Sequence, residues 1–155
     1  MITPVSSSVN EYVPFSVTYT VSAPEPIPGD PNPVIPPILE SVSVTASDGN
    51  DYSSELTITI HGDTSFTVEG LLADVFNREM HYLDKDDNFG LVRRFKDIPA
   101  DFNTLYHYKG ATVNSVDITV SAITDQGTET ATIIVQNNYN VANAYLVNYV
   151  ALGKY

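Results

Sequence analysis

The sequence contains no cysteine and no tryptophan, and its first 77 residues contain neither lysine nor arginine. Without cysteine there is no disulfide framework, and cysteine usage says nothing about the redox compartment. The formal net charge is −12, and all seven basic residues come after position 77. Nucleic-acid binding needs a basic face that neutralises phosphates, so we expect no nucleic-acid partner. Anionic membrane surfaces are disfavoured for the same reason.

Long apolar runs are also missing. No stretch approaches the roughly 18 residues that a membrane-spanning helix requires, so we expect no membrane partner. The first residues, Met1-Ile2-Thr3-Pro4, have neither the basic region nor the apolar region of a signal peptide. We therefore expect a protein that is made in the cytoplasm without a leader.

Sequence patterns of enzymes are equally scarce. The chain has no G-x-S-x-G nucleophile motif, no G-x-G-x-x-G motif and no Walker lysine motif. Its three histidines, His61, His81 and His107, are isolated from one another in sequence and form no zinc-binding motif. We expect no enzymatic activity and no cofactor.

Proline is abundant, and nine of the ten prolines lie in residues 1–37. The stretch from Pro24 to Pro37 cannot form a helix or the interior of a sheet, because proline lacks an N–H group and fixes φ. It favours polyproline II, which at about 3.1 Å per residue predicts a stiff spacer of roughly 40 Å. This composition divides the chain into an N-terminal strand and proline-rich arm over 1–37, a domain over 38–137 and a C-terminal extension over 138–155.

The arm contains one well-patterned strand. Apolar Phe15, Val17, Tyr19 and Val21 alternate with serine and threonine, which is the period of a strand with one apolar face. A single strand is not stable alone, so it must pair with the domain behind it or with another chain. We expect these four residues to form an interface with a neighbouring subunit.

Residues 38–137 contain several short strands separated by turns. Alternation of apolar and polar residues predicts strands over 39–46, 56–60 and 65–69. The clearest signal is a hairpin over 115–136, in which Gly127 occupies a turn position that tolerates positive φ. Regular spacing of short strands is typical of a β-sandwich.

Residues 71–110 are less regular. Apolar spacing favours a helix or turn over 70–77, whereas 78–83 and 91–95 fit strands better. The C-terminal residues 145–150 are apolar on both faces and fit either a covered strand or a short helix. Both alternatives stay open.

The loop that begins at Asp84 is the best metal candidate. Asp84, Asp86 and Asn88 have the alternating spacing of calcium ligands on a tight loop. The EF-hand pattern then requires glycine at its sixth position and glutamate at its twelfth, where this chain has Phe89 and Phe95. The three residues are therefore only weak calcium candidates, and the main expectation is a solvated acidic turn.

The predicted hairpin carries a resemblance to a known family. Residues 116–135 read VDITVSAITDQGTETATIIV, which resembles the last hairpin of immunoglobulin-like modules of the PKD or cadherin-like kind. Residues 38–46, followed by Asp48-Gly49-Asn50, resemble the first strand and turn of the same modules. The resemblance implies an all-β, immunoglobulin-like β-sandwich over roughly 38–137, with the arm and the extension on either side.

The arrangement also resembles structural proteins of tailed-phage virions, which combine such modules with extended arms. By analogy we expect a non-enzymatic virion component in a capsid decoration, neck, tail or baseplate role, located in the virion and made in the host cytoplasm. Its partners would be other virion proteins or copies of itself in an oligomeric assembly. The alternative is a secreted or surface adhesin or carbohydrate-binding module. Exposed tyrosines are good contact residues, and the expected interface includes four of them: Tyr139, Tyr145, Tyr149 and Tyr155.

Overall fold

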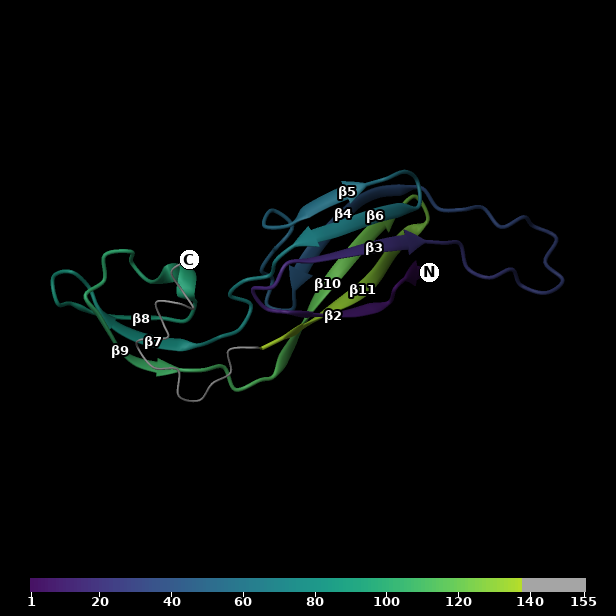
Figure 1. The fold of residues 1–155 in the computed structure, drawn as a ribbon. Coiled ribbons are helices and arrows are strands. Elements are labelled where there is room, and N and C mark those ends of the chain that lie inside the picture. The colour runs from purple at the N-terminus through teal and green to yellow at the C-terminus, as the bar shows by residue number, and fades with distance from the viewer. Residues whose placement is uncertain (138–155) are drawn as a thin grey trace. The chain divides into compact units, whose positions relative to one another are not determined.

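The computed structural model describes residues 1–137, and these residues form two compact units. The sandwich unit comprises Met1–Leu72 and Asp117–Val135. Among the described residues, the small-sheet unit comprises Ala73–Val116 with Gln136 and Asn137. Strands dominate both units, and the described residues contain a single short 3₁₀ turn, η1, at Phe95–Asp97 (Figure 1). The all-β class predicted from the sequence is confirmed.

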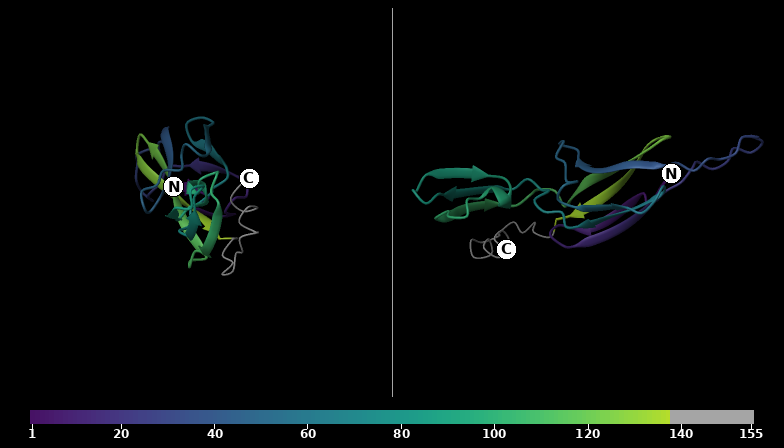
Figure 2. Two further views of the ribbon diagram at one scale, coloured as in Figure 1. Left: turned by 90° about the vertical axis from the view of Figure 1, so that its left-hand side faces the viewer. Right: turned by 90° about the horizontal axis from the view of Figure 1, so that it is seen from above.

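The sandwich unit is built from two four-stranded sheets (Figures 1 and 2). The strand order is β1-β3-β6-β5 in the first sheet and β2-β11-β10-β4 in the second. The first sheet contains β1 (Ile2–Thr3), β3 (Phe15–Val21), β6 (Ser65–Gly70) and β5 (Thr57–Ile60). The second contains β2 (Ser6–Asn10), β11 (Gly127–Gln136), β10 (Ser115–Thr124) and β4 (Leu39–Ala46).

The core of the sandwich unit follows from period-2 alternation. In the first sheet Tyr19 pairs with Phe66 across β3 and β6, and their stacked rings lie 5.0 Å apart at the centroids. Both side chains are fully buried. Alternate residues of the hairpin β10–β11 supply the other side of the core, including the fully buried Val120 and Ile133. Gly127, which opens β11, has the positive φ predicted for it.

The strand at Phe15–Val21 has the predicted bounds, but it does not belong to a separate arm. It pairs with β1 on one side and with β6 on the other, both within the chain. The first strands are therefore part of the sandwich unit, and the division at residue 37 does not match the structure. The physical reason is that the proline stretch is a loop between β3 and β4, whose two ends are both held by the sandwich unit.

The small-sheet unit contains one three-stranded antiparallel sheet in the order β8-β7-β9. Its strands are β7 (Glu79–Leu83), β8 (Phe89–Val92) and β9 (Thr104–Lys109). Strand β7 agrees with the strand predicted over 78–83. Of the helix or turn expected over 70–77, the helix is absent: Gly70 ends β6, and the residues that follow form bends, with a φ of 57° at Asp74.

A buried arginine lies at the centre of this unit. The guanidinium of Arg78 lies over the rings of Phe76 and Phe95, 5.6 and 5.0 Å from their centroids. One of its nitrogens, Nη2, donates a hydrogen bond of 3.3 Å to Oδ1 of Asn137. Nearby, the buried carboxylate of Asp74 accepts hydrogen bonds from the backbone N–H groups of Phe95 and Lys96. The charge of Arg78 is therefore buried against aromatic faces, which attract cations.

Gly90 in β8 lies opposite Tyr82 in β7, and the tyrosine ring covers it. A Cβ atom at position 90 would lie only 2.2 Å from Cζ of Tyr82. We expect Gly90→Ala to displace the ring and to lower the unfolding free energy of the small-sheet unit by about 1–3 kcal/mol, the usual cost of overpacking. Urea denaturation followed by hydrogen exchange in β7 measures the effect.

Gly62→Ala is the matched control, because a Cβ at Gly62 meets no atom within 4 Å. If the clash is the cause, Gly90→Ala combined with Tyr82→Ser will cost no more than Tyr82→Ser alone. An equal cost of Gly90→Ala in both backgrounds would contradict this explanation.

Candidate functional site: an open aromatic face

One face of the β8-β7-β9 sheet carries a row of aromatic and aliphatic side chains. His81 of β7 pairs with Leu91 of β8 and with His107 of β9, so these three residues share a face. Leu83 pairs with Phe89 two residues further along β7 and therefore lies on the same face, since side chains alternate along a strand. We call this surface the aromatic face.

Tyr106 joins the face through an irregularity in β9. The register between β7 and β9 shifts between His81 and Tyr82, and Tyr106 is the residue without a partner in the ladder. Its ring centroid lies 5.9 Å from that of His81 and 6.0 Å from that of Phe89, while His81 and His107 lie 5.0 Å apart. A bulge of this kind re-aims a side chain, and here it completes a continuous cluster of four rings.

The two faces of the sheet differ sharply in burial. On the inner face Met80 and Leu105 are buried. On the aromatic face Phe89 is 81% exposed, and Leu91 and Tyr106 are also exposed. A contiguous group of exposed aromatic and aliphatic side chains is typical of a surface that binds a partner.

The loop at one end of the aromatic face begins at Asp84 and is held by hydrogen bonds between the Asp84 side chain and backbone N–H groups of the loop. Oδ1 of Asp84 accepts hydrogen bonds of 2.9 Å from the N–H groups of Asp86 and Asn88. The hydrogen bond from Asn88 is the largest effect that holds the pKa of Asp84 below its ordinary value. Asp87 accepts a hydrogen bond from Asn103. Asp84, the first of the three calcium candidates, therefore uses Oδ1 to fix the turn.

Among residues 1–137 no group of three or more His, Asp or Glu side chains lies close enough together to hold a metal ion. His81 and His107 are in contact but have no third ligand of this kind. His61 lies in the sandwich unit, where Nε2 is 2.7 Å from Oγ1 of Thr67. The described part of the chain also contains no helix that is long and apolar enough to cross a membrane.

Charged side chains lie at the other end of the face. Arg93 Nη1 lies 3.9 Å from Oε1 of Glu79, and Lys109 is opposite Glu79 in the backbone register of β7 and β9. Exposed ion pairs of this kind contribute little to stability. They border the apolar centre of the face as a polar rim, which is the usual anatomy of a protein interface.

Four of the eight predicted interface residues belong to strand β3 of the sandwich unit. Tyr19 and Val21 are buried in the sandwich unit, and Phe15 and Val17 are half-buried in the same strand. On one side β6 pairs with residues 15–20 of β3, whereas on the other side β1 pairs only with Thr20 and Val21, so the strand has its main partner, β6, within the chain. The remaining four residues of the predicted interface lie outside the described residues: Tyr139, Tyr145, Tyr149 and Tyr155.

Sequence reasoning missed the residues that form the aromatic face. The available signal was the alternation Phe89-Gly90-Leu91 directly after an acidic turn. Strand β8 begins at Phe89 and ends at Val92, so it overlaps the strand predicted over 91–95 only at its first two residues. Tyr106 has no such signal, because its position depends on the bulge in β9. Comparison with known proteins adds no candidate, since no protein-family model, no curated protein and no solved structure matches the chain.

Proposed function

We propose that this chain is a non-enzymatic structural protein that docks on a neighbouring protein subunit through its aromatic face. The observation that carries the proposal is the exposure of Phe89, Leu91 and Tyr106 on one face of a sheet whose other face is buried. Burying such a face against a partner removes apolar surface from water, at about 25 cal/mol per Å². Exposed aromatic side chains are also the residues that most often dominate binding energy.

The class that we propose is an immunoglobulin-like module. In such modules the strands are arranged as A-B-E-D in one sheet and C-F-G in the other. The orders β1-β3-β6-β5 and β2-β11-β10-β4 fit this plan if β1 and β2 share the role of the first strand. On this assignment the small-sheet unit is an insertion between strands E and F, and the proline-rich loop joins B to C.

The particular role that we propose is that of a tailed-phage virion component, at a capsid decoration, neck, tail or baseplate position. The support is an analogy of architecture, in which a β-sandwich module that carries an extended proline-rich segment resembles such proteins. Its partner would be another virion protein or a second copy in an oligomeric assembly. The proposal includes localisation in the virion, with no nucleic-acid or membrane partner and no cofactor.

The test is coexpression of the full chain with the proteins encoded beside it, followed by sedimentation of the assembled particles. We expect the chain to sediment with capsid or tail particles, and Phe89→Ser and Leu91→Ser each to lower its incorporation about tenfold or more, as for a central contact. Val113→Ser is the matched control, because Val113 and Leu91 are both 48% exposed.

Absence of virion genes around this one, or no cosedimentation, would contradict the virion role. Equal incorporation of the Leu91 and Val113 variants would show that the aromatic face is not the contact surface. Circular dichroism of each variant checks that the strands are retained.

One observation favours a second candidate, a carbohydrate-binding module. A cluster of rings is formed by Tyr106, His81 and His107. Each ring combines an apolar face with a polar atom that can form hydrogen bonds, which suits contact with a hydrated ligand. Glycan-array binding by the isolated chain that is lost in Tyr106→Ser would support it. Absence of glycan binding would exclude this second candidate, and only the protein-docking proposal would remain.

A further inference from the structure

The charges of this protein are divided between its two units. The sandwich unit contains no lysine or arginine, whereas the rest of the chain contains all seven of them with seven acids. The charges outside the sandwich unit cancel, so the sandwich unit carries the whole formal net charge of −12. Its acids are Glu11, Glu25, Asp30, Glu40, Asp48, Asp51, Glu55, Asp63, Glu69, Asp117, Asp125 and Glu129.

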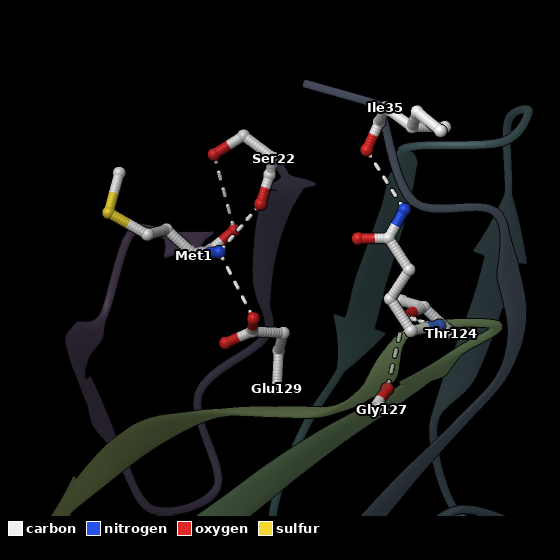
Figure 3. A network of polar contacts seen from close by, with 7 residues as sticks. Met1, Ser22, Ile35, Thr124, Gly127 and Glu129 are labelled. Atoms are coloured by element: carbon white, nitrogen blue, oxygen red, sulfur yellow. Dashed lines mark hydrogen bonds and ion pairs between the residues drawn. The ribbon is translucent and has the colours of Figure 1, made fainter. Parts of the chain in front are cut away.

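The proline-rich loop, residues 22–38, is held at both ends by this acidic unit. At its start, the N–H of Ser22 donates to the carbonyl of Met1, and at its end the N–H of Ile38 donates to Oδ1 of Asp125. The side chain of Gln126 donates a hydrogen bond of 2.8 Å to the carbonyl of Ile35 (Figure 3). These contacts fix the base of the loop to Met1, which precedes β1, and to the turn between β10 and β11.

The loop reverses direction at its tip. The N–H of Asp30 donates to the carbonyl of Ile27, and Gly29 between them has a φ of 84°. The two halves of the loop run side by side away from the strands (Figures 1 and 2). Seven prolines over 24–37 restrict the backbone, so the loop loses less conformational entropy on binding than an ordinary loop of this length.

The two halves enclose an open groove of about 480 Å³. Its lining is mainly apolar, with Pro24, Ile27 and Ile35 among the residues, and Glu25 and Asp30 are the two acids in it. Ile35 is 66% exposed, and Ile27 is similarly open to solvent. The volume lies in the range of ordinary ligand sites, and the mixture of aliphatic walls and carboxylates suits a long cationic side chain.

We propose that this groove binds a basic and apolar segment of a protein partner. The aliphatic stem of a lysine or arginine lies along Pro24 and the isoleucines, and its charged end faces Glu25 or Asp30. The charge of the whole unit steers such a partner towards the groove and raises the association rate. The groove belongs to the sandwich unit, and the proposal does not depend on the role of the aromatic face.

Charge also argues against a second copy of this chain as the occupant. Another copy brings its own net charge of −12, and like-charge juxtaposition opposes association. A basic partner is attracted by the negative charge of the sandwich unit. Binding is therefore expected to weaken as salt rises, because screening shortens the range of these interactions.

The experiment selects binders from a displayed library of random dodecapeptides with the immobilised full chain at about 0.05 M salt, where screening is weak. We expect selected peptides to be enriched in lysine or arginine next to aliphatic or aromatic residues. Fluorescence anisotropy of the best synthetic peptide then measures binding. Ile35→Ser and the double change Glu25→Gln with Asp30→Asn are each expected to weaken it at least about tenfold.

Two matched controls separate the groove from the rest of the unit. Ile60→Ser removes an aliphatic side chain that is 46% exposed elsewhere in the sandwich unit. Glu40→Gln with Glu69→Gln removes two exposed acids from strands of the same unit. We expect binding in both controls to stay within about twofold of the unchanged chain.

Three results would overturn the proposal. The first is a selection without enrichment of basic residues. The second is equal binding by the groove variants and their controls. The third is sedimentation velocity that shows a dimer of the chain which Ile35→Ser dissociates, since a second copy would then be the occupant.

Discussion

Replacing Phe66 by alanine is expected to cost the sandwich unit about 3–5 kcal/mol of unfolding free energy, the usual range for a buried phenylalanine. Phe66 is fully buried in β6 and stacks on Tyr19 of β3. The strand is flanked by β3 and β5, so the cavity would open in the middle of a sheet rather than at its edge. Such a loss is a large part of the 5–15 kcal/mol that a typical domain possesses.

Urea denaturation monitored by circular dichroism measures this effect. Phe89→Ala is the control, because it removes the same side chain from a position that is 81% exposed, and we expect a change within about 0.5 kcal/mol. Similar midpoints for the two variants would show that Phe66 is not packed as described. Tyr19 offers a second readout, because burial raises the pKa of its hydroxyl. Opening the core is expected to bring that pKa back towards its ordinary value.

Arg78→Ala is expected to produce the second large loss, about 3 kcal/mol or more, in the small-sheet unit. The change leaves a void over the rings of Phe76 and Phe95 and removes the donor to Asn137. Removal of one member of a buried charged group commonly costs this much, because its former partners remain buried. Hydrogen exchange in β7 and β9 reports the loss directly.

Arg93→Ala is the matched control for Arg78→Ala. Arg93 is exposed and lies 3.9 Å from Glu79, so its removal is expected to cost less than about 1 kcal/mol. Arg78→Lys separates charge from shape, because an ammonium group cannot stack as a planar guanidinium does. Full stability of Arg78→Lys would show that the positive charge alone matters and that the planar shape of the guanidinium over the two rings contributes nothing.

The strands with the strongest alternation could be predicted from the sequence. Phe15–Val21 was found with its bounds, and so was the hairpin that contains Gly127, because each shows one apolar face through local spacing alone. Strands β1 and β2 were missed, since two residues around Ile2 and a run of serines ending at Val9 show no such period. Their burial arises from pairing with strands distant in sequence.

The candidate site could not be derived in the same way. Local pattern shows that Phe15–Val21 needs a partner, but it does not distinguish a partner in the same chain from one in another subunit. The aromatic face requires the register of three strands and the bulge that re-aims Tyr106. Over 70–77 the helical spacing of apolar residues was misleading, because the backbone has a positive φ at Asp74, two residues before the buried Phe76.

The position of the small-sheet unit along the chain has a consequence for folding kinetics. Residues 71–114 separate β6 from β10, and β10 must still find β4, with Val120 opposite Val44. Pairings between residues so far apart in sequence are slow to form, because the loop entropy is lost before the contacts are made. An inserted segment that folds early shortens the flexible loop that remains. The refolding rate of the sandwich is therefore expected to depend on residues that belong to its insertion rather than to its own core.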